Sequence, residues 1–242
     1  MKRFKKLLCI TLALAMVIST SVTAFASGRN IAAYNMIILE DSDNQRVVQT
    51  SDNNFTYITA YNKVNNTIQF TVVDQATNSA NIGAVVSVDD YSVTPIGARA
   101  SINENTFTNY EYTKIYGNPN EWELRRPDGS LAGTYYFKTY EATQNQSYLN
   151  AFKSAVDTIN TKEGEIVGTY GLQILSILAA AAAGAGAIFT GGILTAAAWG
   201  SILAAAGATT AHIAVVMAWD RACKNAYDAY FETYTKSPVV FY

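Results

Sequence analysis

Few side chains in this chain of 242 residues could perform catalysis. The only histidine, His212, lies inside a long apolar stretch, which argues against a histidine-rich metal site and against a Ser-His-Asp triad. We expect His212 to be a buried, hydrogen-bonded helical residue, and the alternative is a pH-sensitive group that controls membrane insertion. The sequence contains no Gly-x-Ser-x-Gly motif, no phosphate loop and no dinucleotide fingerprint.

Two acidic clusters are the other candidates for chemistry. Asp41-Ser42-Asp43 resembles the start of a calcium loop but lacks the later Gly and Glu, which favours a solvated turn. Glu121 and Glu123 would point to the same face of a strand and could act as acid and base, although surface charge is the simpler interpretation. The sequence therefore predicts a protein that is not an enzyme, with no catalytic residue, no metal site and no cofactor.

The most distinctive segment extends from Ile166 to Trp219 and contains no Lys, Arg, Asp or Glu. An uncharged run well beyond about 18 residues is typical of membrane-spanning helices. Thr190-Gly191-Gly192, near its middle, favours a tight reversal. The pattern predicts an apolar helical hairpin with arms over about 166–189 and 193–219. At about 1.5 Å per residue, each arm could cross a hydrocarbon core of about 30 Å.

Small residues recur at every fourth position of both arms, which would let helices approach closely in lipid or in water. The arms are only marginally hydrophobic, which favours a protein that is exported first and inserts later. The alternative is a soluble alanine-rich core hairpin that never meets a membrane. The candidate membrane-interaction residues are Gly191, Gly192, Ala196, Gly200, Ala204, Ala208, Trp199 and Trp219.

A soluble form of this protein would need to cover the hairpin, because a monomer normally exposes only a few hundred Å² of contiguous apolar surface. Amphipathic segments flank the run on both sides. We expect the cover to be a helix around Leu149 to Ile159 together with the aromatic face of Tyr227, Tyr230, Phe231 and Tyr234.

The first 26 residues have the three regions of a signal peptide. Four basic residues precede an apolar stretch over 7–18, and Ala24-Phe25-Ala26 favours cleavage before Ser27. Cleavage removes four of the 17 basic residues and none of the 19 acidic ones, so the net charge falls from −2 to −6. A secreted protein with this charge is an improbable nucleic-acid partner. Cys223 would be its only cysteine, so no internal disulfide can form.

Strand-forming residues dominate the chain from about residue 31 to residue 140, and a helical period of three and four begins near Asn145. The sequence predicts an α+β protein, with an N-terminal antiparallel β-sandwich or barrel-like domain followed by a C-terminal helical domain. The expected boundaries are a signal peptide at 1–26, a β-rich domain at 27–143, and a helical domain at 144–242 that contains the hairpin at 166–219.

An exported, β-rich chain with an Ala/Gly-rich hairpin near its end resembles the geobacillin-type family of large secreted bacteriocins in overall plan. The resemblance implies a secreted antimicrobial protein that acts on target-cell membranes through the hairpin. It also implies a target membrane, a surface receptor and a cognate immunity protein as partners. The alternative is a non-catalytic secreted surface or adhesion protein whose hairpin is a structural core or an anchor.

Overall fold

The computed structural model describes residues 34–91, 103–128, 134–186 and 192–242. Within these ranges the chain is α+β, with strands first and helices after them. The described strands form two antiparallel sheets, each a meander of sequential neighbours except for the last strand of the chain. The expected α+β class is confirmed.

Sheet A, the first sheet, has the order β1-β2-β3-β4-β5. Its strands alternate between buried and partly exposed positions, as expected for a sheet with one covered face. Left-handed backbone at Asn66 and Asn78 shapes the turns after β3 and β4. The strands are β1 (Asn35–Asp41), β2 (Gln45–Ser51), β3 (Phe55–Asn62), β4 (Thr67–Asp74) and β5 (Ala80–Ser87).

Sheet B, the second sheet, has the order β10-β9-β8-β7-β6. The two-residue strand near the end of the chain lies at one edge of this sheet. It pairs with β9, which comes from the middle of the sequence. The strands are β6 (Asn103–Asn105), β7 (Glu111–Ile115), β8 (Glu121–Pro127), β9 (Thr134–Tyr140) and β10 (Val240–Phe241).

Among the described residues, the helical part has two long α-helices and two short ones. The long ones are amphipathic, and the short ones consist mainly of Ala, Leu and Ile and carry no charged residue. The α-helices are α2 (Gln146–Tyr170), α3 (Leu172–Gly184), α5 (Ala196–Ala205) and α6 (Ile213–Lys236), and the 3-10 helices are η1 (Asp89–Tyr91) and η2 (Thr210–His212).

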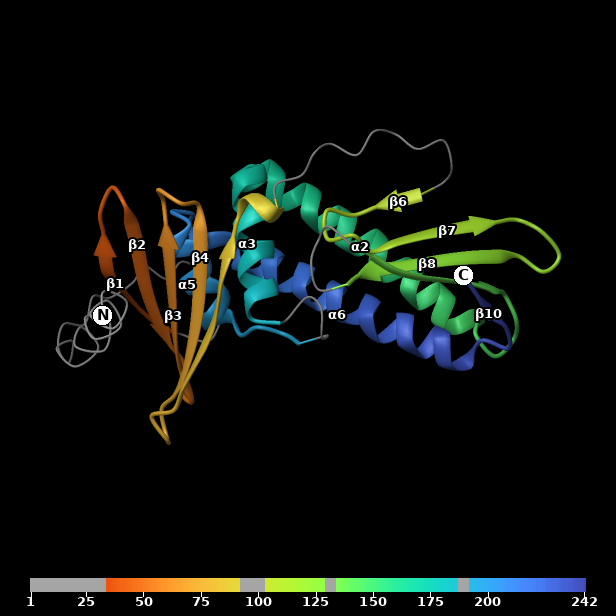
Figure 1. The fold of residues 1–242 in the computed structure, drawn as a ribbon, viewed down its shortest axis with the longest axis horizontal. Helices are drawn as coiled ribbons and strands as arrows, with labels where there is room; N and C mark the ends of the chain where they lie inside the picture. Colours follow the sequence, from red (N-terminus) through yellow and green to blue (C-terminus); the bar gives the residue numbers. More distant parts are fainter. Residues whose placement is uncertain (1–33, 92–102, 129–133, 187–191) are drawn as a thin grey trace, which may run out of the picture.

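The helices divide between the two sheets (Figure 1). The short helices pack on sheet A, α5 against β2 and β3 and α3 against β4 and β5. The long helices α2 and α6 pack along each other and contact sheet B. The strands do not form the expected sandwich or barrel-like arrangement. The two sheets lie at opposite ends of the molecule, and each packs against helices instead of against the other sheet. Apolar helices bury one face of sheet A and amphipathic helices bury one face of sheet B, which makes barrel closure unnecessary.

The two continuous arms expected for the hairpin are interrupted. Gly171, with φ of 86°, separates α2 from α3, and Gly207, with φ of 78°, lies in the turn that follows α5. A positive φ ends a helix and is tolerated best by glycine. No helix in the described ranges combines the length and the apolar character needed to cross a membrane. Residues 187–191, which include the expected reversal at Gly191, lie outside the described residues.

Candidate functional site

The helix α5 is seated directly on sheet A through small and hydroxyl-bearing residues. The Thr50 hydroxyl donates to the carbonyl oxygen of Ala197 at 2.6 Å, and the Thr59 and Ser201 hydroxyl oxygens are 2.6 Å apart. All of these side chains are buried. At Gly200 the missing side chain leaves room for the ring of Tyr34, since a Cβ there would lie 2.6 Å from the ring. The small residues of α5 therefore serve close contact with the sheet side of the core.

The helix α3 approaches the edge of the same sheet in a similar way. A Cβ at Gly83 of β5 would lie 2.5 Å from the Phe70 carbonyl oxygen and 3.2 Å from that of Gly184. A Cβ at Gly184 would in turn lie 3.1 Å from Val86. Two glycines, one in the strand and one at the end of the helix, thus permit this approach. Together, α3 and α5 form the apolar pair, the name used below for these two helices.

The apolar pair is tied to α6 by a buried carboxylate at Asp220. One carboxylate oxygen accepts hydrogen bonds from the Leu194 backbone N–H at 2.8 Å and from the Trp199 indole N–H at 2.9 Å. The other oxygen is buried and has no hydrogen-bond partner among the described residues. Burial raises the pKa of Asp220 to about 6, although the two donors and Arg221 act in the opposite direction.

A second buried carboxylate, Glu163 of α2, holds the loop that precedes β7. It accepts hydrogen bonds from the backbone N–H groups of Phe107 and Thr108, from the Thr108 hydroxyl and from the Trp219 indole N–H. Burial raises the pKa of Glu163 to about 7 against the lowering effect of these four donors. The carboxylate therefore ties this loop to both long helices.

The two carboxylates are linked by a pair of tryptophans. Trp219 donates to Glu163, Trp199 donates to Asp220, and the two indole rings meet edge to face with centroids 5.7 Å apart. Cys223 lies one turn further along α6 and is also buried. Burial and the nearby carboxylates raise its thiol pKa well above the usual value, which disfavours the reactive thiolate.

The structure brings together only some of the expected membrane-interaction residues. Trp199 and Trp219 are fully buried and in contact, and Gly200 and Ala204 are buried in the same core. Ala196 is the first residue of α5 and Ala208 follows the helix, and both are half-buried against that core. Gly192 is partly exposed in the irregular segment before α5, and Gly191 lies outside the described residues.

Glu163 and Asp220 were not expected to be important. Neither acid is among the candidate residues that the sequence analysis names, and both are buried. One signal was available, since these acids stand at the two ends of the uncharged run. The expectation for His212 was also wrong: the residue is exposed at the end of η2, with its ring 6.0 Å from that of Tyr170.

The expected cover of the hairpin was also wrong. The apolar pair is covered on one side by sheet A, whereas α2 and α6 use their aromatic faces mainly against sheet B, as in the contact of Tyr230 with Phe137 at 4.9 Å. Phe152 is fully buried, but Phe231 and Tyr234 are substantially exposed.

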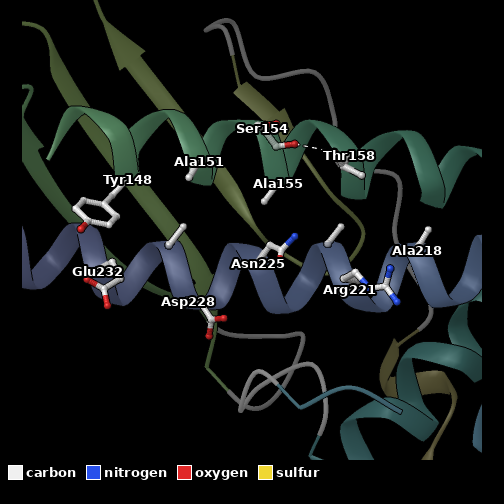
Figure 2. A pocket seen from close by; sticks show the side chains of 12 residues that line it. Tyr148, Ala151, Ser154, Ala155, Thr158, Ala218, Arg221, Asn225, Asp228 and Glu232 are labelled. Atoms are coloured by element: carbon white, nitrogen blue, oxygen red, sulfur yellow. Dashed lines mark hydrogen bonds between the residues drawn. The ribbon is translucent and has the colours of Figure 1, made fainter. Parts of the chain in front are cut away.

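A shallow groove runs between α2 and α6, lined by small residues such as Ala151, Ala155 and Ala218 (Figure 2). Such small side chains allow the two helices to lie close together.

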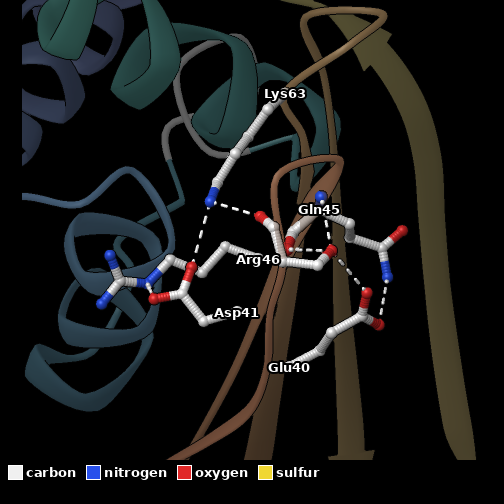
Figure 3. Close-up of polar contacts among 6 residues, drawn as sticks. Glu40, Asp41, Gln45, Arg46 and Lys63 are labelled. Carbon is white, nitrogen blue, oxygen red and sulfur yellow. Dashed lines mark hydrogen bonds and ion pairs between the residues drawn. The ribbon is translucent and has the colours of Figure 1, made fainter.

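The two acidic clusters form ordinary surface structure. Asp41 is the exposed last residue of β1, where its carboxylate accepts a 3.0 Å hydrogen bond from Lys63 and faces Arg46 at 3.8 Å (Figure 3). The Lys63 bond lowers the pKa of Asp41. Glu123 pairs with Arg125 and Lys138 on the exposed face of sheet B. Within the described ranges, no group of three His, Cys, Asp or Glu side chains could hold a metal ion.

Comparison with known proteins gives no further guide to the site. No family model, no curated protein and no solved structure matches this chain. The chemical interpretation therefore rests on the arrangement just described. That arrangement is an uncharged helical pair, bounded by two glycines in left-handed conformation and held in place by a few hydroxyl groups and a buried carboxylate.

Proposed function

We propose that this chain is a secreted bacterial antimicrobial protein, a bacteriocin, that acts on target-cell membranes by releasing its apolar helical hairpin. The observation that carries the proposal is the way the apolar pair is stored. An uncharged segment is packed on one face of a sheet, and Gly171 and Gly207 at its ends have the backbone freedom of hinges.

The polar contacts of the stored pair support release as a unit. Side-chain hydrogen bonds link Thr50 and Thr59 of sheet A to α5, and Asp220 of α6 accepts hydrogen bonds from Leu194 and Trp199. An ionised Asp220 is costly in the interior and would be hydrated after opening. The ionised Asp220 carboxylate therefore destabilises the stored form at neutral pH.

Release also offers a route to a longer apolar element. The chain from Ile166 to Trp219 has no charged residue, so straightening at Gly171 and Gly207 would not bring a Lys, Arg, Asp or Glu from this segment into the hydrocarbon. A target-cell membrane is accordingly the proposed partner, together with a surface receptor and an immunity protein. No cofactor and no catalytic residue enter this mechanism.

A reversible covalent lock tests the proposal. The hydroxyl oxygens of Thr59 and Ser201 are 2.6 Å apart, so Thr59→Cys combined with Ser201→Cys places two sulfur atoms where a disulfide of about 2.05 Å can form. The oxidised protein should neither release dye from phosphatidylglycerol-containing vesicles nor kill Gram-positive cells. Reduction should restore both activities to the level of the unmodified protein.

The single variant Ser201→Cys, treated with the same oxidant and reductant, is the matched control for this lock. It should remain active after both oxidation and reduction, because it keeps Thr59 and has no cysteine there with which Cys at position 201 could form a disulfide. If the oxidised double variant permeabilises vesicles as fast as the reduced one, α5 does not leave sheet A and the proposed mechanism is wrong.

The alternative function is a non-catalytic secreted surface or adhesion protein in which the hairpin is a structural core. The full burial of Trp199, Ile202 and Leu203 in the core favours this second candidate. It predicts that the locked and reduced proteins behave alike, and that neither releases dye. The same vesicle experiment thus distinguishes the two functions.

A further inference from the structure

The face of sheet A that points away from the apolar pair carries almost no charge. Its central row crosses all five strands in register and consists of Ile37, Gln49, Ile58, Thr71 and Ile82. All five lie on the side opposite Thr50 and Thr59, because side chains alternate along each strand. This surface, called the outer face of sheet A below, is built from apolar and neutral polar side chains.

The neighbouring row has the same character. Val47, Ala60, Gln69 and Val85 follow one another across β2 to β5, and only Glu40, on the edge strand β1, is charged. Ile82 is 64% exposed and Val85 is 63% exposed. Asp41 at the end of β1, Arg46 near the start of β2 and Lys63 after β3 form a charged cluster at one end of the sheet (Figure 3).

Sheet B shows that this composition is not a general property of the protein. Its corresponding exposed face carries a network in which Arg125 pairs with Glu111 and Glu123, and Lys138 pairs with Glu123. A solvated sheet face normally mixes charges of both signs in this way. The outer face of sheet A therefore departs from the expected surface in the same molecule.

The size of the outer face matches a self-association surface. Five strands spaced about 4.8 Å apart, with about seven residues each at about 3.4 Å, give a patch of roughly 600 Å². Standard interfaces remove about 800 Å² per partner, counted as accessible surface. Two flat sheets can pack face to face about 10 Å apart, and a twofold axis brings the same row against itself.

We propose that two copies of this chain associate through the outer faces of sheet A to form a twofold-symmetric, four-layered dimer. The uncharged central row meets itself without like-charge repulsion. A lipid surface is a poorer fit, because the central row lacks the Trp, Tyr, Lys and Arg side chains that anchor proteins at membrane interfaces. Each subunit keeps its apolar pair on the far side of the sheet, so association leaves the proposed release unobstructed.

Sedimentation analysis of the full chain tests the dimer. We expect a weak monomer–dimer equilibrium with dimer predominant at about 100 µM, because a patch of this size lies at the low end of the range for specific interfaces. Gln49→Lys and Ile58→Lys each place an unpaired ammonium group at the centre of the interface and should raise the dimer dissociation constant at least tenfold. Gln49 is a polar, partly exposed residue, so its replacement removes no buried apolar side chain.

Val64→Lys is the matched control, because Val64 is 67% exposed in the turn after β3 and lies off the outer face. This variant should dimerise like the unmodified chain, and all three variants should retain its circular dichroism spectrum. A monomeric unmodified chain, or Gln49→Lys and Ile58→Lys variants that dimerise normally, would overturn the proposal. Co-sedimentation of a monomeric chain with vesicles, abolished by Gln49→Lys, would instead assign the face to lipid.

Discussion

Buried carboxylates are the residues at which stability and pH are most closely connected in this protein. Glu163 and Asp220 have raised pKa values of about 7 and about 6, so the folded state holds their protons more tightly than the unfolded chain. Their stabilising contribution is therefore complete below the unfolded pKa values near 4 and is lost as the pH rises through 6 and 7.

The pH profile provides the first prediction. Raising the pH from about 4.5 to about 7.5 should lower the free energy of unfolding, and Glu163 alone should account for up to about 3 kcal/mol. Urea titrations at several pH values measure this slope. Glu163→Gln should flatten the profile, whatever its effect on absolute stability, since an amide does not titrate. A profile that rises with pH in both proteins would contradict the assignment.

Two phenylalanines on the long helices provide a matched comparison. Phe152 is fully buried, so Phe152→Ala should reduce the free energy of unfolding by about 3 to 5 kcal/mol. Phe231 is 39% exposed, and Phe231→Ala should cost clearly less, about 1 kcal/mol. Chemical denaturation of both variants measures the difference. Equal losses would mean that the exposed position contributes as much packing as the buried one.

At the scale of secondary structure, the local patterns in the sequence were informative. Strand-forming residues predicted a β-rich first half, and a helical period correctly placed the start of α2 near Asn145. The partition of helices between sheets could not be predicted in this way, because Ala-rich helices pack equally well on helices, sheets and lipid. The breaks at Gly171 and Gly207 depend on a positive φ, which a glycine allows but does not require.

The break at Gly171 provides an element-scale prediction. Gly171→Ala should destabilise the folded protein by about 1 to 2 kcal/mol, because alanine is strained at a φ of 86°. Gly168→Ala, three residues earlier in α2, has open space for its methyl group and should stabilise by about 0.5 to 1 kcal/mol through helix propensity. Thermal melting distinguishes the two signs.

The same pair of variants also informs the proposed function. Alanine at position 171 favours a continuous helix across the break, so Gly171→Ala should release dye from vesicles at a lower protein concentration than the unmodified chain. Gly168→Ala stabilises the stored form and should require a higher concentration. Opposite or equal shifts would mean that straightening at this position has no part in membrane action.

For the whole molecule, the sequence predicts export. The mature protein should begin at Ser27 and accumulate in the culture medium, because the first 26 residues have the charged, apolar and small-residue regions of a signal peptide. Terminal sequencing of secreted protein measures the cleavage site. Recovery of membrane-bound protein with Met1 intact would argue against release. These residues lie outside the described ranges, so the prediction rests on sequence alone.

The seating of α5 on sheet A has a consequence for the time course of folding. Thr50 and its partner Ala197 are 147 residues apart in sequence. Contacts of such long range are slow to form, because the intervening chain must first be brought together. During synthesis, the tyrosine and phenylalanine side chains on the inner face of sheet A emerge well before the helices that cover them. The nascent chain therefore cannot complete this core early, and it remains open to chaperones until its last third has been made.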